Sequence, residues 1–206
     1  MGLDRKPVGE PEFWDGLYAE GNDGWELRSS SPPLVSWLDA GGRLGPEGAR
    51  VAVPGCGRGH DARLLTKWGY GVVGFDFAEA AVGEARALAA AENSAARFER
   101  RDIFTLASEF AEAFDAVWEY TCFCAIDPAR RADYVEVVRA ILKPGGTLLG
   151  CFYPLREGGD GPPYPVALAE VEQLLAPGFR VMESRAPAAS VERRRGLEWL
   201  LRATRV

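Results

Sequence analysis

From Arg50 onward, apolar segments of strand length alternate with segments of helical character. The expected strands are 50–54, 70–76, 96–102, 113–123 and 146–154, and the expected helices are 60–69, 78–93 and 128–146. Strands that alternate with helices pair in parallel through right-handed crossovers, and the helices cover both faces of the sheet. The pattern therefore predicts a three-layer α/β fold with a mostly parallel sheet, whose ligands bind at the carboxyl ends of the strands.

The two ends of the chain depart from this alternation. Two strand-like segments, 179–187 and 197–206, are joined by a polar turn with no helix between them, which predicts an antiparallel hairpin added to the sheet. At the other end, apolar residues at helical spacing predict two short helices. A chain of this length fits a single domain, 1–206, with 1–45 as an N-terminal helical segment and 46–206 as the core.

The charge balance disfavours several classes of partner. Lys and Arg total 24 against 30 Asp and Glu, a net charge of −6, so the positive field that gathers nucleic acid or anionic membranes is absent. No apolar segment reaches the length of a membrane span, and the first residues lack a signal-peptide core. We therefore expect a cytoplasmic monomer that binds a small molecule, and we interpret the charge run 192–195 as a solvated turn.

The cysteines do not form a metal-binding pattern. All four lie in apolar or glycine-rich surroundings, and no second cysteine pair stands at zinc-ligand spacing from Cys122 and Cys124. His60 is the only histidine. We expect reduced thiols and no metal.

A glycine-rich turn, PGCGRGHD, follows the first expected strand. Gly55, Gly57 and Gly59 have a G-x-G-x-G spacing, in which the third glycine comes one residue earlier than in the dinucleotide fingerprint. The Gly-Lys-Ser/Thr ending of a triphosphate loop is also missing. The turn therefore favours neither of those ligands.

Acidic residues end the next two strands. Asp76 lies 21 residues after Gly55, the distance at which a carboxylate accepts hydrogen bonds from a ribose diol. Asp102 ends the following strand, where it can reach an adenine amino group, and Phe77 either packs on the adenine or lies in the core. Together these features predict a nucleoside pocket. The alternative is that both aspartates only cap the helices that follow them.

Seven segments carry a resemblance to a known family, and they keep their order along nearly the whole chain: FWDGLYAEGNDGW, VPGCGRGHDA, VVGFDFAEAAV, RDIF, FDAVWEYTCFCAIDPARRADYV, LKPGGTLL and GPPYPV. Together they resemble the thiopurine methyltransferase-like family, most closely its thiol and halide methyltransferases. The resemblance implies the Rossmann-like sheet of a class I S-adenosylmethionine-dependent methyltransferase. The implied acceptor is a small soft nucleophile, a thiol or else hydrosulfide or halide, with thiopurine-like and metalloid acceptors as alternatives.

The resemblance also assigns residues to the cofactor S-adenosylmethionine. Those it implies are Trp14, Tyr18 and Trp25 in an N-terminal lid, and Gly55, Asp76, Asp102, Ile103 and Tyr120 in the pocket; Gly57 and Phe77 join them as parts of the glycine turn and the second strand end. Aromatic faces attract a cationic sulfonium by about 0.5 to 2 kcal/mol. The alternative is that the three lid aromatics only form the core of a small helical cap. Glu26-Leu27 departs from the family's usual Asp and small or glycine-containing turn, which leaves lid shape and acceptor choice open.

No catalytic residue is assigned, because an acceptor that is already anionic needs no general base. Glu119 could be a base or a hydrogen-bond acceptor on the cofactor side, whereas His60 is expected to hold the glycine turn. Phe123, Tyr153 and Tyr164 are candidates to shape the acceptor pocket, with the protein core as the alternative for Phe123 and the favoured place for Tyr153.

Two other functions remain as alternatives. The segment GPPY, at Gly161–Tyr164, is similar to the motif with which nucleic-acid amino methyltransferases grip a flipped base, but it follows the fifth strand rather than the fourth, and the net acidity also opposes that function. A non-catalytic S-adenosylmethionine sensor or interaction module on the same fold belongs to a different class.

Overall fold

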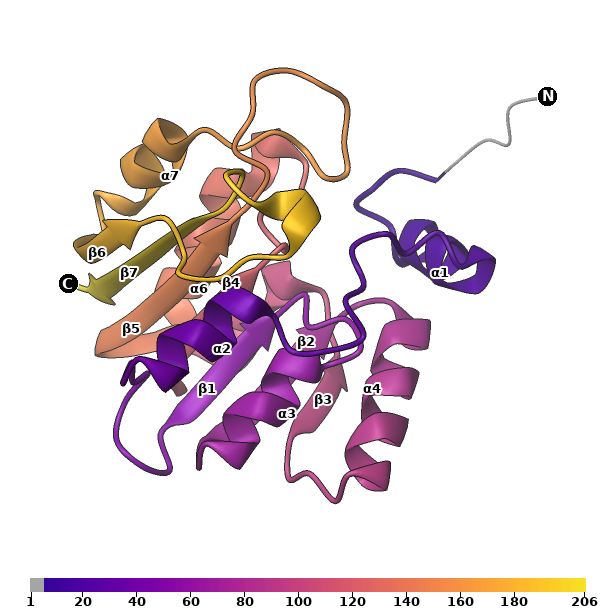
Figure 1. The fold of residues 1–206 in the computed structure, drawn as a ribbon, viewed down its shortest axis with the longest axis horizontal. Helices are drawn as coiled ribbons and strands as arrows, with labels where there is room; N and C mark the ends of the chain where they lie inside the picture. The colour runs from indigo at the N-terminus through magenta and orange to yellow at the C-terminus, as the bar shows by residue number, and fades with distance from the viewer. Residues whose placement is uncertain (1–5) are drawn as a thin grey trace.

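A computed structural model describes residues 6–206. The strands are β1 (Arg50–Pro54), β2 (Gly71–Asp76), β3 (Arg97–Arg100), β4 (Phe114–Tyr120), β5 (Leu142–Phe152), β6 (Phe179–Arg185) and β7 (Trp199–Arg205). They form one sheet in the order β3-β2-β1-β4-β5-β7-β6 (Figure 1). The first five strands are parallel, and β7 runs antiparallel to both β5 and β6. The predicted parallel sheet and antiparallel hairpin are confirmed.

Helices cover both faces of the sheet. They are α1 (Pro11–Glu20), α2 (Pro32–Asp39), α3 (His60–Lys67), α4 (Glu79–Ala91), α5 (Leu106–Glu109), α6 (Arg131–Ile141) and α7 (Leu168–Leu175). Side chains of α2, α3 and α4 share one buried cluster with Val51 and Val53, whereas α5, α6 and α7 share the other cluster with Ala52. Since neighbouring residues of a strand point to opposite faces, β1 separates the two clusters, and the three-layer prediction is confirmed.

Two element boundaries differ from the sequence prediction. The helix expected in the segment 128–146, with Pro-Gly-Gly as its stop, already ends at Ile141, because the Lys-Pro-Gly-Gly segment belongs to β5, which begins at Leu142. Helix α7 was not predicted, although Val171 and Leu175 are buried on one of its faces at the i, i+4 spacing of a helix.

The predicted N-terminal segment 1–45 is divided between two environments, leaving aside residues 1–5, which lie outside the described part of the chain. Helix α2 belongs to the core, because Leu34 and Leu38 are essentially inaccessible. Helix α1 lies outside the sheet layers, beside α4 (Figure 1), and Leu17 is its one buried residue. Asp15 of α1 accepts the Ala80 N–H in the first turn of α4 at 3.0 Å. Within the described part of segment 1–45, α1 and the loop after it therefore lie apart from the core, whereas α2 is part of it.

No helix within residues 6–206 is long and apolar enough to cross a membrane.

Candidate active site

A cavity of about 730 Å³ opens at the carboxyl ends of β1, β2 and β4, the edge at which the fold predicts ligand binding. Its wall includes all ten residues predicted from the sequence: Trp14, Tyr18, Trp25, Gly55, Gly57, Asp76, Phe77, Asp102, Ile103 and Tyr120. These residues come from the α1 region, the glycine turn and three strand ends. The structure thus brings the predicted set together, while the contacts of each residue with a cofactor stay a prediction.

The glycine turn requires glycine on steric grounds. Gly55, Gly57 and Gly59 have φ values of +59°, +52° and +70°, in the left-handed region that side-chain-bearing residues rarely adopt. A Cβ on Gly55 would lie 2.8 Å from the Cys122 Sγ, and one on Gly57 would lie 3.3 Å from the Tyr18 hydroxyl oxygen. The bare backbone of the turn therefore forms a wall of the cavity.

Asp76 holds this turn and also faces the cavity. Its Oδ2 accepts the Gly57 N–H at 2.9 Å, and its Oδ1 accepts the Ala78 N–H at 3.0 Å, just before α4 begins. Burial raises the pKa of Asp76, although these backbone donors oppose the rise. Asp76 does not cap α4, because its Oδ1 bonds the N–H of Ala78, the residue before the helix. Each of its carboxylate oxygens keeps a second lone pair for a ligand.

Asp102 both caps a short helix and lines the cavity. Its Oδ1 accepts the Phe104 N–H at 2.9 Å and so caps the short helix Ile103–Thr105. The side chain is exposed and lines the cavity mouth. Phe77 is half-buried, stands outside the two core clusters and also lines the cavity.

The three aromatic residues of the predicted lid form one cluster over the turn. The rings of Trp14 and Trp25 meet edge to face with centroids 5.5 Å apart, as do those of Tyr18 and Trp25. Trp25 Nε1 donates to the Tyr18 hydroxyl at 3.4 Å. The cluster is half-buried and lines the cavity, so it is more than the interior of a helical cap.

Comparison with known proteins identifies the family. The thiopurine S-methyltransferase family model matches residues 9–205. The chain belongs to this family. It is 33% identical over 190 residues to "Probable thiol methyltransferase 2" of Arabidopsis thaliana and to "Thiocyanate methyltransferase 1" of Brassica oleracea, covering 91% of this chain and 82% of each relative. A "Thiopurine S-methyltransferase" of Legionella pneumophila is 29% identical over 173 residues, covering 77% of both chains.

Solved structures support the fold assignment. The Burkholderia thailandensis 1,6-didemethyltoxoflavin-N1-methyltransferase, with S-adenosylhomocysteine bound, superposes with a TM-score of 0.71 at 20% identity, covering 95% of this chain and 87% of that one. A TehB-like S-adenosylmethionine-dependent methyltransferase from Corynebacterium glutamicum has a TM-score of 0.64 at 20% identity, with 94% of both chains covered. The class I methyltransferase fold and membership of a methyltransferase family are therefore established.

The interpretation of residues 192–195 as a solvated turn was wrong for Arg194. In this family member Arg194 is 2% exposed and lines the cavity. It donates to the Tyr120 hydroxyl at 2.6 Å and to the Trp25 carbonyl at 3.0 Å, while Glu198 accepts from the Tyr120 hydroxyl at 2.6 Å. A charge run does not reveal which of its members turns inward, but Glu198, four residues later and directly before the apolar strand β7, was a usable signal.

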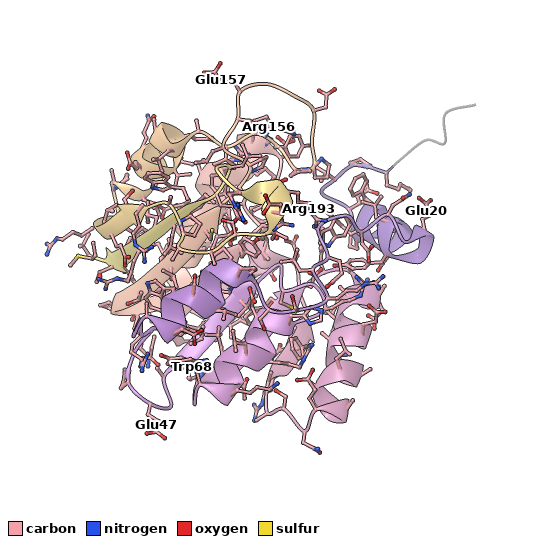
Figure 2. All side chains as sticks on the ribbon, in the orientation of Figure 1. Glu20, Glu47, Trp68, Arg156, Glu157 and Arg193 are labelled. Carbon is pink, nitrogen blue, oxygen red and sulfur yellow. The ribbon has the colours of Figure 1, made fainter. Side chains whose placement is uncertain are left out.

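Sequence reasoning also missed Arg58 and Arg193. Arg58, in the glycine turn, contacts the carboxylates of Asp23 and Glu26 and stands 5.0 Å from the Tyr18 ring centroid. Arg193, labelled in Figure 2, donates to the Gly24 carbonyl at 2.7 Å. These contacts join segments 32 to 169 residues apart, so local sequence contains no signal for them.

His60 lies beside the loop that follows α1, at Glu26. Its Nε2 is 3.0 Å from Glu26 Oε1, and its Nδ1 is 2.9 Å from an Arg63 guanidinium nitrogen. Its carbonyl accepts from the Ser30 hydroxyl at 3.1 Å. The geometry agrees with the expectation that His60 holds the turn.

Glu119 is buried and does not line the cavity. It points to the opposite sheet face from its neighbours Trp118 and Tyr120, accepts the Phe123 N–H at 2.9 Å, and accepts from the Tyr134 hydroxyl. Burial raises the pKa of Glu119 to about 7. Its contacts support the turn after β4.

Of the three residues proposed for the acceptor pocket, only Tyr153 lines the cavity, where its ring centroid is 4.8 Å from the Arg194 guanidinium carbon. Phe123 is 2% exposed and belongs to the core. Within residues 6–206 the four cysteines are free thiols, and no cluster of three or more His, Cys, Asp or Glu is arranged to hold a metal ion.

Proposed function

We propose that this methyltransferase uses S-adenosylmethionine to methylate a small soft nucleophile, a thiol first, with hydrosulfide, thiocyanate and halide as further acceptors. The observation that carries the proposal is the gathering of the glycine turn, two strand-end aspartates and the aromatic cluster around one cavity. The names of the thiol and thiocyanate methyltransferases to which the chain is 33% identical support the acceptor class.

The cavity wall fits the proposed cofactor. Gly55 and Gly57 present backbone without side chains, so a ligand can approach closely. Asp76 and Asp102 each keep acceptor lone pairs toward the cavity, which suits the hydroxyl and amino groups of an adenosine. The aromatic cluster offers ring faces to a cation.

S-adenosylmethionine supplies a methyl group activated by a cationic sulfonium. The chain's own residues contribute binding, orientation and exclusion of water. The aromatic cluster covers the turn, and the buried Arg194 and the half-buried Tyr120 bound the cavity beside Tyr153. Holding two reactants at near-attack distance supplies roughly 7 to 11 kcal/mol of a barrier. A thiol that enters as its thiolate has already lost its proton to solvent, so it needs no general base, as is true of the other anionic acceptors. The cationic groups of Arg193 and Arg194 favour an anion there.

An acceptor panel tests this function. The wild-type protein is incubated with methyl-labelled S-adenosylmethionine and, separately, an aryl thiol, hydrosulfide, thiocyanate, iodide, a thiopurine and a metalloid anion. Labelled methyl thioether from the thiol is the expected main product. Preferential methylation of the thiopurine or metalloid would replace the proposed acceptor, and cofactor binding without turnover on any acceptor would support the sensor alternative.

A cytoplasmic location, a monomeric state and one domain with a lid made of α1 and the loop after it complete the proposal. They rest on the net charge, the absence of a membrane-spanning helix in residues 6–206, and the position of α1 outside the sheet layers.

A further inference from the structure

Arg58 stands where three separate elements meet. Its guanidinium contacts Asp23 and Glu26 from the loop after α1, and Glu84 from α4. The Glu26 contact is 3.2 Å, and the side chains of Arg58 and Glu26 are only 17% and 10% exposed. We call the contacts of Arg58 with Asp23 and Glu26 the clasp.

The clasp differs from an ordinary surface ion pair. Several carboxylates converge on one partly buried guanidinium, which is the setting in which charge-assisted hydrogen bonds are strong. Burial alone would raise the pKa of Glu26, but its contacts with His60, the Arg28 N–H and Arg58 outweigh burial and lower the pKa to about 2. Glu26 is therefore ionised at neutral pH, as the clasp requires.

The clasp acts on the aromatic cluster. The Arg58 guanidinium carbon stands 5.0 Å from the centroid of the Tyr18 ring, and the Tyr18 hydroxyl lies against Gly57 and accepts from Trp25. Gly57 in turn donates to Asp76. Arg58 thus contacts the aromatic cluster directly at Tyr18. Through Tyr18 and Gly57 the contacts continue to the glycine turn and to the Asp76 carboxylate.

The loop after α1 also has contacts on its other side, and these do not involve Arg58. Arg193 and Arg194 donate to the carbonyls of Gly24 and Trp25 at 2.7 and 3.0 Å. Segment 23–26 is therefore secured to the C-terminal turn by its backbone and to the glycine turn by its side chains. Losing the clasp would leave the contact between His60 and Glu26 as the remaining side-chain link to the glycine turn, while the other side of the loop stays attached.

We propose that Arg58 is a positioning residue that holds Tyr18 and Trp25 over the cofactor end of the cavity, so that it sets cofactor affinity without touching the reacting atoms. The inference rests on the proposed function, because it presupposes that the cavity binds S-adenosylmethionine. The sequence position explains the arrangement, since Arg58 directly follows Gly57 in the turn.

The test measures the dissociation constant of S-adenosylhomocysteine by calorimetry, together with the urea midpoint of each variant. Arg58→Met is expected to weaken binding about tenfold, with Arg58→Lys recovering part of the loss. The double variant Asp23→Asn/Glu26→Gln should lose at least as much affinity as Arg58→Met, because it also removes the Glu26 charge that contacts His60. Glu84→Gln should change affinity little, because Glu84 is 54% exposed and lies on α4.

A matched control removes another ion pair far from the cavity. Lys143→Met breaks the 2.6 Å contact with Asp115 and should leave S-adenosylhomocysteine affinity unchanged. Wild-type affinity in both Arg58→Met and the Asp23/Glu26 double variant would overturn the inference, as would an equal loss in Glu84→Gln. Failure of the wild-type protein to bind S-adenosylhomocysteine at all would instead overturn the proposed function.

Discussion

At the scale of single residues, the cavity depends on groups that hold two partners at once. Asp76 accepts from two backbone donors while facing the cavity, and the Tyr120 hydroxyl donates to Glu198 while accepting from Arg194. Such groups are costly to leave unpaired in a low-dielectric interior. The same hydrogen bonds therefore determine the geometry of the cavity wall and contribute to the stability of the folded protein.

Arg194 illustrates this link between geometry and stability. The nearest cationic partner of the buried Glu198 carboxylate is the Arg194 guanidinium, 4.0 Å away. Arg194→Met would remove this partner and leave the carboxylate buried without it. We expect the free energy of unfolding to fall by about 3 to 5 kcal/mol, as urea denaturation would measure. Arg194→Met/Glu198→Gln should recover part of that loss, because the uncompensated charge is gone. A single-variant loss below about 1 kcal/mol would contradict the buried ionic contact.

At the scale of elements, strand ends and the turns after them determine where the functional groups lie. Strand β4 is the clearest case: Trp118 and Tyr120 face the cavity, while Glu119 between them faces the other side and supports the following turn. A shift of one residue in the register of β4 would exchange these faces.

The raised pKa of Glu119 predicts a pH dependence of stability. Its pKa is about 7 in the folded protein against an ordinary 4.5, so the folded state binds the proton more tightly than the unfolded state. The stabilisation from this group is complete below about pH 4.5 and is lost as the pH rises through 7. Glu119→Gln should flatten the fall in urea midpoint between about pH 5 and pH 8, a window that extends about one to two pH units on either side of the Glu119 pKa. An unchanged slope in the variant would show that other groups cause the fall.

At the scale of the whole molecule, the fold and one wall of the cavity were predictable from sequence. Alternating strands and helices determine the topology, and Gly55, Asp76 and Asp102 follow strands at spacings that place them at one sheet edge. Hydrophobic periodicity and residue spacing within short segments are therefore enough to predict the topology and these three positions.

The remaining parts of the site depend on contacts between distant segments. Arg194 meets Trp25 across 169 positions of sequence, and Arg58 meets Asp23 across 35. Whether a charged residue turns inward depends on which carboxylate or carbonyl the fold brings to it, and one sequence does not contain that pairing. The missed helix α7 is different, because its apolar spacing was present in the sequence.

We infer that this cavity is the cofactor site of a methyltransferase, and a calorimetric comparison can test that assignment. S-adenosylhomocysteine is titrated into the wild-type protein and into Asp76→Asn, which keeps the size of the side chain but removes its charge. We predict one bound molecule per wild-type chain and affinity at least about tenfold weaker in the variant, with an intact fold by circular dichroism. Equal affinity in the two proteins would contradict the claim.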